Sequence, residues 1–456
     1  MVTNRLLEIA EGTVSLALKH DVSQAQAAAF LVDSALTRYA NSEIHQNVAS
    51  KEGGVAIKVV VGKSIGTLRV YSLDKMQIEK AVEKAVKIAQ VTPSNKDFKS
   101  LPEPAKWTPI KGTYDSKTAQ CTPAYRAEKV LEAIDTAHSR SQMVNTVAGS
   151  FSIASFAFAI ANSLGVSAWA LLSTTSLQTT VISKSRGSQG FGSAEQHSKR
   201  IRDIEPTRIG GEAAEKSINS INPKKIPVGE YEVVLSPRAA AGLFTYLAYI
   251  GFSATTYQDG QSFIKYNLGK QVFDEKLNIK DDARDPNALY SFPVDGEGVP
   301  KRAIQLVENG KVSEKSICYD SFTAGKEDKK STGHALPPIF GFYSRPMPIN
   351  ITVTPKDASL EELIQETKQG IFITRFHYTN PVDPTKAILT GLTRDGTFLI
   401  ERGEVTKPVM NLRYTDSMLS ALKDIPMIGK HTNIVEEVTT PAMKLKNLRF
   451  TGITQY

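Results

Sequence analysis

Residues 236–251 read SPRAAAGLFTYLAYIG and carry helix signals at both ends. Ser236 suits an N-cap, Pro237 suits the first helical position, and Gly251 suits the end of a helix. Between these ends, apolar residues recur at steps of three and four and form one stripe: Ala240, Leu243, Phe244, Leu247 and Ile250. Because an apolar run at residues 231–235 comes directly before, the stretch predicts a strand followed by an amphipathic helix.

The chain after this helix has the pattern of a mainly β domain. Short apolar runs alternate there with turn dipeptides that are typical of hairpins. These dipeptides are Asn309-Gly310, Asp395-Gly396 and Arg402-Gly403. Two further helices are predicted, one at residues 360–368 between Ser359 and Gly370, and one at residues 416–422. The polar stretch at residues 326–338 predicts a surface loop.

The chain before residue 223 combines helices with strands. The predicted elements of its first part are a helix at 4–20, an extended segment at 25–44, paired strands at 55–61 and 66–71, and a helix at 74–90. A linker with several prolines, residues 92–113, follows them.

The next part shows matches to the first at an offset of 121 positions. The matching features are the helix at 125–138, the triplets Ala40-Asn41-Ser42 and Ala161-Asn162-Ser163, and the glycines Gly66 and Gly187. Strands at 151–180 and a closing helix at 204–218 complete a similar plan. An internal duplication is one interpretation, and chance matching of common residues is the other.

The fold class predicted is therefore α+β, with a duplicated helix and antiparallel-strand N-terminal half followed by a mainly β C-terminal domain. The expected division is 1–112, 113–222 and 223–456, since 456 residues exceed what one core usually supports.

Composition narrows the functional classes. The 55 basic residues are dispersed among 47 acidic ones, and no basic run of the nucleic-acid-binding type accompanies the net charge of +8. Cys121 and Cys318 lie far apart, which favours a reducing compartment over a disulfide framework. The N-terminus does not resemble a signal peptide and no apolar run approaches 18 residues, so we expect a cytoplasmic protein without a membrane segment.

Common catalytic motifs are absent, namely paired histidines at zinc-helix spacing, a phosphate loop, a nucleophile elbow and a Cys-x-x-Cys pair. The strongest polar cluster has five carboxylates within 17 residues: Asp281, Asp282, Asp285, Asp295 and Glu297. Such a cluster could bind a hard cation, although Asp at strand ends more often makes turns. His334, in the polar loop, and His377, beside aromatic and basic neighbours, are further cleft candidates.

A family resemblance emerges from the succession of short motifs along the chain. These are residues 54–61 (GVAIKVVV), 81–89 (AVEKAVKIA), 231–235 (YEVVL), 281–282 (DD), 295–300 (DGEGVP), 307–312 (VENGKV), 331–333 (STG), 382–384 (VDP) and 395–405 (DGTFLIERGEV). In this order they resemble the TldD/PmbA family, also called modulators of DNA gyrase, over nearly the whole chain.

The resemblance implies a zinc metallopeptidase scaffold without its zinc ligands. In the catalytic members a His-Glu-x-x-x-His helix and a distant cysteine hold the metal. The corresponding positions here are Thr245, Tyr246, Ile250 and, for the cysteine, about Tyr378. Zinc needs nitrogen, sulfur or carboxylate donors, and the reaction needs a carboxylate base. The chain therefore resembles the non-catalytic TldE/PmbA branch, and we expect no cofactor bound by this chain itself.

Three functions follow as hypotheses. The resemblance implies a subunit that pairs with a TldD-type, zinc-bearing homologue, or self-associates, and helps to process unfolded peptides or modified-peptide precursors. A stand-alone hydrolase would instead use Asp281, Asp295, Glu297, His334 and His377, which would have to converge on one cleft. A gyrase-associated or nucleic-acid-binding module is the third, and the dispersed charge argues against it.

Overall fold

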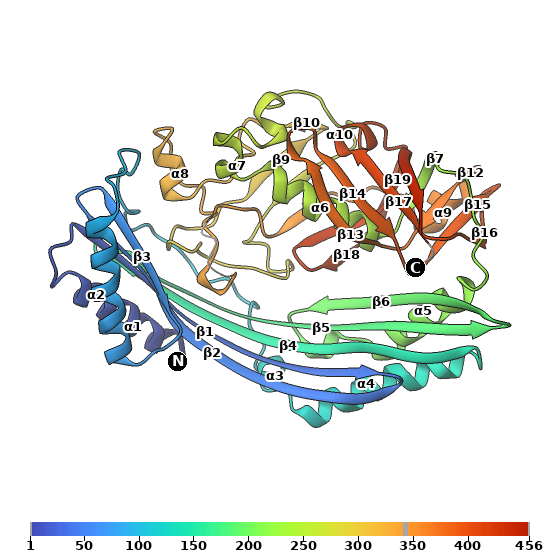
Figure 1. The fold of residues 1–456 in the computed structure, drawn as a ribbon, viewed down its shortest axis with the longest axis horizontal. Helices are drawn as coiled ribbons and strands as arrows, with labels where there is room; N and C mark the ends of the chain where they lie inside the picture. Colours follow the sequence, from blue (N-terminus) through green and yellow to red (C-terminus); the bar gives the residue numbers. More distant parts are fainter. Residues whose placement is uncertain (1, 341–344, 455–456) are drawn as a thin grey trace.

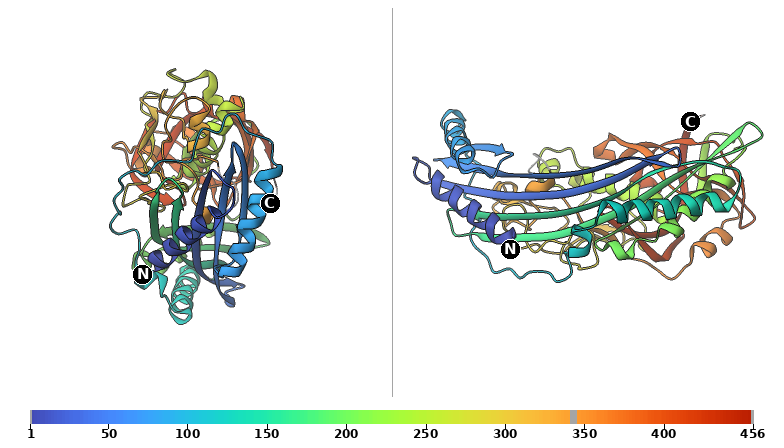
Figure 2. Two further views of the ribbon diagram at one scale, coloured as in Figure 1. Left: turned by 90° about the vertical axis from the view of Figure 1, so that its left-hand side faces the viewer. Right: turned by 90° about the horizontal axis from the view of Figure 1, so that it is seen from below.

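The computed structural model describes residues 2–340 and 345–454. A long, curved sheet occupies one side of the molecule, and the mainly β C-terminal domain lies against its concave face (Figure 1). Helices cover the convex face, as the view from below shows (Figure 2). The predicted α+β class, with its mainly β C-terminal part, is confirmed.

The long sheet joins strands from two units with the same order of main elements. The first unit is α1 (Val2–Ala17), β1 (Gln24–Ala40), β2 (Glu43–Val61), β3 (Ser64–Val70) and α2 (Lys75–Val91). The second is α4 (Pro123–Arg140), β4 (Val144–Asn162), β5 (Ser167–Ser185), β6 (Ser188–Ser198) and α5 (Pro206–Asn219), with the short α3 (Ser116–Ala119) and η1 (Ile201–Asp203) beside it. All strands are antiparallel in the order β3-β2-β1-β4-β5-β6.

Both faces of β1 are covered because its small residues alternate between two cores. Ala27 and Ala29 pack against α1 and α2, whereas Ala28 and Phe30 join a core shared with the C-terminal domain. That shared core includes Phe292 from the C-terminal domain and Phe158 from β4, whose rings lie 5.6 Å apart. The sheet is thus the middle layer between helices and the C-terminal domain.

Glycines in the edge strands let helices approach closely in both units. A Cβ on Gly66 of β3 would lie 2.1 Å from the Ala85 carbonyl oxygen of α2, and one on Gly192 of β6 would lie 2.2 Å from the Ala213 carbonyl oxygen of α5. Gly187, which sequence spacing matched to Gly66, lies instead in the β5–β6 turn with φ 82°. In packing, both Gly190 and Gly192 of β6 correspond to Gly66, since a Cβ on Gly190 would lie 2.0 Å from the Ser217 carbonyl oxygen of α5.

The C-terminal domain is built around a second, mixed sheet. Its order is β10-β9-β8-β11-β19-β7-β12-β15-β16, and β13, β14, β17 and β18 join through β17 and β19. The strands are β7 (Gly229–Leu235), β8 (Ile279–Asp281), β9 (Ile304–Glu308), β10 (Lys311–Val312), β11 (Ile351–Val353), β12 (Gln369–Ile373), β13 (Phe376–Asp383), β14 (Ile388–Thr393), β15 (Thr397–Glu401), β16 (Glu404–Pro408), β17 (Leu412–Ser417), β18 (Met427–Val435) and β19 (Val438–Ile453).

Helix α6 (Pro237–Gly251) is the long helix of this domain, and the sequence predicts it correctly. The Ser236 hydroxyl accepts a hydrogen bond from the Ala239 N–H, and Pro237 opens the helix. The whole predicted stripe is buried in the domain core: Ala240, Leu243, Phe244, Leu247 and Ile250. The short helices are α7 (Ala254–Gln258), η2 (Phe263–Tyr266), α8 (Ser321–Gly325), η3 (Pro338–Phe340), α9 (Leu360–Gln365), η4 (Pro384–Lys386) and α10 (Met418–Ala421).

Two predicted helices are shorter than expected. The Ser359 capping box starts α9, but the helix ends at Gln365 and Gly370 lies in β12. Residues 412–417 belong to β17, so only the last part of the predicted 416–422 helix forms, as α10. Among the described helices, none combines the length and hydrophobicity needed to cross a membrane.

Candidate functional site

The positions that the family resemblance assigns to zinc ligands on α6 are occupied by packing residues. Ile250 is 3% exposed and belongs to the domain core, and Tyr246 packs partly buried against the same core. Thr245 lies beside the carboxyl group of Glu437, whose pKa is raised mainly by burial and partly lowered by Thr245. An isoleucine side chain offers no donor atom, so this helix face is held by apolar contact rather than by a metal.

The fourth position, Tyr378, lies on β13, which packs on α6. Its side chain is 71% exposed and its φ is 51°, at an irregularity in the pairing of β13 with β14. Threonine, isoleucine and two tyrosines do not fit a zinc ion, which takes nitrogen, sulfur or carboxylate ligands. Within residues 2–340 and 345–454, no group of three or more histidine, cysteine or acidic side chains is placed to hold a metal.

A buried charge cluster lies elsewhere, around Asp281 at the end of β8. Asp281 Oδ1 accepts the N–H groups of Ile349 and Asn350, each at 2.7 Å. Its Oδ2 lies 2.9 Å from His334 Nε2 and 3.9 Å from Lys301 Nζ. Burial alone would raise the pKa of Asp281, but Lys301 and His334 outweigh burial and hold this pKa at about 2. The ionised carboxylate thus ties three loops together.

Asp295 performs a similar task in the adjacent loop. Its Oδ1 accepts the N–H groups of Glu297 and Val299 at 2.9 Å, and its Oδ2 accepts the N–H of Ala335 at 3.0 Å. Burial, and then the charge of Glu297, raise the pKa of Asp295 to about 7. These bonds hold residues 295–299 against residues 335–336. A Cβ on Gly296 would lie 2.1 Å from the Leu336 carbonyl oxygen, so this approach requires glycine.

Glu297 links the C-terminal domain to the long sheet. Its Oε1 lies 3.1 Å from Lys58 Nζ on β2, and its Oε2 accepts the Ser321 N–H at 2.8 Å and the Ser321 hydroxyl at 2.6 Å. Burial would raise the pKa of Glu297, but Lys58 and Ser321 lower it. The neighbouring Asp320 caps α8, and burial together with the charge of Glu297 raises the pKa of Asp320 to about 6.

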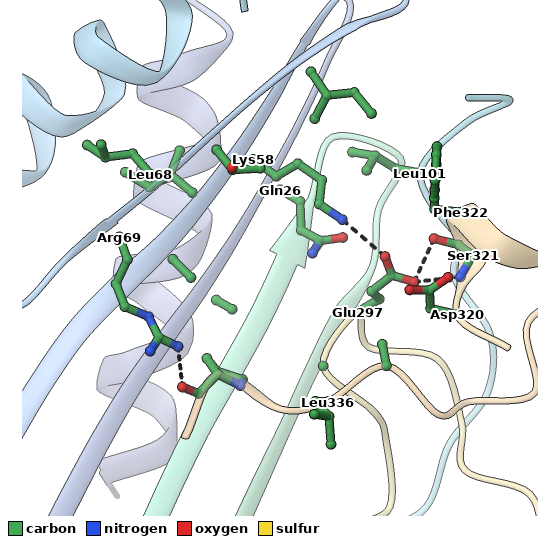
Figure 3. A pocket seen from close by; sticks show the side chains of 18 of the residues that line it. Gln26, Lys58, Leu68, Arg69, Leu101, Glu297, Asp320, Ser321, Phe322 and Leu336 are labelled. Atoms are coloured by element: carbon green, nitrogen blue, oxygen red, sulfur yellow. Dashed lines mark hydrogen bonds and ion pairs between the residues drawn. The ribbon is translucent and has the colours of Figure 1, made fainter. Parts of the chain in front are cut away.

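A cavity of about 320 Å³ opens beside Glu297. Strands β1–β3 form one wall, and residues 296–297, 320–322 and 335–338 of the C-terminal domain form the other (Figure 3). Residues of the linker after α2, including Phe98 and Leu101, close one side. The cavity therefore lies between the two halves of the molecule, and its polar atoms come from both.

The structure brings together four of the five cleft candidates. Asp281 contacts His334, and Asp295 accepts the N–H groups of Glu297 and of Ala335, the residue after His334. His377 lies apart on β13, where burial and then Arg375 and Arg394 lower its pKa. The hydrolase hypothesis required all five to share one cleft, and His377 belongs to a different group of charges.

The polar loop at residues 326–338 is only partly a surface loop. Residues 326–330 are mostly exposed, but residues 333–335 are buried, and His334 is 1% exposed. The burial follows from the bonds of His334 and Ala335 to Asp281 and Asp295, which hydropathy cannot reveal.

Several residues of the site were not singled out from the sequence, namely Gln26, Lys58, Lys301 and Asp320. Lys58 had a usable signal, because it interrupts the apolar run at residues 55–61. Asp320 also had a signal in the sequence, because an Asp three residues before Thr323 is an N-cap pattern. Gln26 and Lys301 have no local signal, since their neighbours in space come from distant segments.

Comparisons with known proteins match this architecture along the chain. Three family models match: PmbA/TldA metallopeptidase domain 1 at residues 32–89, the central domain at 119–221, and the C-terminal domain at 228–452. The Metalloprotease PmbA of Escherichia coli O157:H7 is 22% identical over 98% of this chain and 96% of its own length.

Two solved structures share the fold. A Thermotoga maritima protein, named as a candidate modulator of a DNA gyrase, has a TM-score of 0.86 at 25% identity, covering 97% of this chain and 99% of that one. TldE from Thermococcus kodakarensis has a TM-score of 0.88 at 20% identity, with the same coverage. With all three family domains matched in order over a shared fold, the chain belongs to the PmbA/TldD family of metallopeptidase-like proteins.

Proposed function

We propose that this chain is a non-catalytic subunit that pairs with a TldD-type zinc metallopeptidase and helps it to process unfolded peptides or modified-peptide precursors. The observation that carries the proposal is the burial of Ile250 in the core, at the position where a catalytic member has its second histidine. Family membership supplies the context. The partner would contribute the zinc ion, which polarises a peptide carbonyl and activates water.

The outer edge of β2 is a suitable surface for such a partner. Strand β3 pairs only with residues 55–61 of β2, so the edge at residues 43–54 has no neighbouring strand in the described structure. Residues 45–52 are all exposed, and they include Val48, which is 42% exposed. A strand edge with free N–H and C=O groups favours pairing with another chain. A homologous chain would present a similar edge.

The two cysteines agree with a cytoplasmic setting, which we include in the proposal. Cys121 and Cys318 are both free thiols, and Cys318 is buried. Burial raises the pKa of each thiol, so neither has the thiolate character of a nucleophile.

The proposal is tested by co-expressing the chain with a His-Glu-x-x-x-His homologue from the same organism. We expect one complex with one zinc ion per pair, peptidase activity in the complex, and neither zinc nor activity in this chain alone. Replacing both histidines of the partner should remove activity and leave the complex intact. Stoichiometric zinc in this chain alone would overturn the proposal, as would activity of the isolated chain. A stable homodimer that does not bind the homologue would favour self-association over the heteromeric pair.

A further inference from the structure

We propose that two copies of this chain join through the outer edges of their β2 strands, in antiparallel register about a two-fold axis at Ala49. The proposal concerns the edge that the proposed function offers to a catalytic homologue, but it needs only copies of this chain. It rests on the open backbone of β2, on the lack of cover over that edge, and on two charged side chains that make no ion pair with a described residue.

The backbone of β2 shows which groups are available at the edge. Residues 46–60 pair with β1 without a register shift, and the Val60 carbonyl accepts the Ser23 N–H on the side of β1. Because successive residues of a strand turn their N–H and C=O groups to opposite sides, the even-numbered residues face β1 and the odd-numbered ones face away. From Val55 onward the odd-numbered residues pair with β3. The residues whose backbone groups stay free are Asn47, Ala49, Lys51 and Gly53.

Another edge of the long sheet, that of β6, is covered by side chains at the end of α5. The Ser220 hydroxyl accepts the Phe191 N–H and donates to the Phe191 carbonyl, and Lys216 Nζ donates to the Ser193 carbonyl. Among the described residues, no side chain covers the free groups of β2 in this way. In Figure 1, β2 runs along the border of the long sheet and extends well beyond β3. Such an edge favours pairing with another strand.

Charges on the face towards the C-terminal domain select the register. Arg38 of β1 lies opposite Gln46 and donates to its Oε1, and Glu52 accepts only the Ser50 hydroxyl. Arg38 and Glu52 are both exposed. Gln46 and Glu52 each lie three residues from Ala49. A two-fold axis at Ala49 therefore places Glu52 of the partner subunit opposite Gln46, in the same cross-strand row as Arg38, and this happens twice in the dimer.

The other pairs in this register are also compatible. Ala49 meets its own copy at the axis, where two small side chains let the backbones approach. Val48 lies opposite Ser50 of the partner subunit, and Asn47 lies opposite Lys51 of the partner subunit. The pairs formed by the free backbone groups give about six hydrogen bonds across the joint.

Neighbouring registers lose the charge match. An axis at Ser50 would place Glu52 of the partner subunit opposite Val48 instead of Gln46. An axis at Val48 would bring it to the irregular part of β2 near Ile44, where the pairing with β1 shifts. In both cases Glu52 of the partner subunit leaves the row of Arg38, so the axis at Ala49 is favoured.

A joint of this size should give a reversible dimer. Because one strand pair buries less surface than a standard interface, we expect a dissociation constant on the order of 1–100 µM. Sedimentation equilibrium of the full chain, without any homologue and at about 10–200 µM, measures it.

Charge reversal tests the edge and the register together. Arg38→Glu and Glu52→Arg each place like charges in the shared row of a homodimer, so each variant alone should lose at least about tenfold in affinity. In a mixture of the two variants, every shared row again holds opposite charges, and the affinity should return. Lys184→Glu, a similar reversal at an exposed position of β5, should leave the affinity unchanged.

The proposal is overturned if the parent chain stays monomeric over this concentration range, or if both single variants dimerise as well as the parent. It is also overturned if the mixture associates no better than either variant alone. Circular dichroism checks that each variant is folded. The result is separate from the proposed function, since no homologue is present: a chain that dimerises here but never binds a catalytic homologue would contradict the proposed function alone.

Discussion

Single residues separate this chain from the catalytic members that it resembles, and Ile250 is the clearest of them. A histidine there would need a partner for its ring nitrogens inside a core made of leucine, phenylalanine and isoleucine. Apolar side chains therefore fill the core around α6. A histidine ligand introduced at this position would bury a polar ring and destabilise the fold even before a metal ion could bind.

Substituting Ile250→His should therefore lower the free energy of unfolding by about 2–5 kcal/mol, through a lost apolar contact and a buried polar ring. Tyr249→His is the matched control, since Tyr249 is 44% exposed on the same helix and stacks under Arg345. It should cost less than about 1 kcal/mol. Urea unfolding followed by circular dichroism measures both. Equal effects from the two variants would contradict the packing role of Ile250.

The Asp281 carboxylate predicts a pH dependence. Because its folded pKa is about 2, below the unfolded value of about 4, its stabilisation is complete above pH 4 and is lost as the pH falls towards 2. Asp281→Asn should cost about 3–5 kcal/mol at pH 7, and this difference should shrink as the pH falls below about 4. Asp282→Asn, at the neighbouring and more exposed position, should cost far less. Thermal midpoints from pH 7 to 3 measure the effect, and a difference independent of pH would rule it out.

Among single residues, the carboxylates of the site could be predicted from the sequence, but most of the residues that contact them could not. Asp281, Asp295 and Glu297 stand out as a cluster, and turn chemistry describes Asp295 well, since three backbone N–H groups surround it. Lys301 and Gln26 could not be found, because their neighbours depend on how loops and strands from different parts of the chain meet.

Elements with caps and periodic stripes were predictable, and strands without an apolar alternation were not. Helix α6 was recognisable from Ser236 to Gly251 because its stripe and its cap agree. The first part of β2 escaped prediction because residues 45–52 are exposed on both faces, which removes the alternation that identifies a strand. Strand β6, rich in serine and glycine, was missed for a similar lack of pattern.

The open edge of β2 leads to a prediction about assembly. Val48→Lys places a charge on the edge and should weaken association with the catalytic homologue at least about tenfold while the chain remains folded. Leu131→Lys is the control, because Leu131 is 47% exposed but lies on helix α4 and not on the strand edge. Gel filtration of mixed subunits and circular dichroism of each variant give the two readouts. If Val48→Lys associates normally, the partner binds another surface.

The whole molecule depends on contact between its two halves. The core between sheet and C-terminal domain draws Ala28, Phe30 and Phe158 from one half and Phe292 and Val294 from the other. Lys58 and Glu297 add an ion pair across the same boundary. This arrangement could not be predicted from the sequence. The apolar character of each segment predicts that it is buried, but not which other segment it packs against.

Separating the halves tests this dependence. Residues 1–222 and 223–456, expressed apart, should each expose part of the shared core, bind a hydrophobic dye such as anilinonaphthalene sulfonate, and lose the dye signal when mixed. The intact chain is the control and should not bind the dye. Two soluble halves without dye binding and without affinity for each other would show that the shared core contributes little.

The order of strands in the long sheet also bears on how the chain reaches its native state. Five pairings connect the six strands, and four of them join strands that follow each other along the chain. Only β1 and β4 pair across a long separation, with residues as distant as Gln26 and Asn162 opposite each other. Closing that loop costs entropy before any contact is gained, so the two hairpin units should form early and their joining should be the slow step. During synthesis, the edge of β1 that pairs with β4 therefore stays unpaired until β4 has emerged from the ribosome.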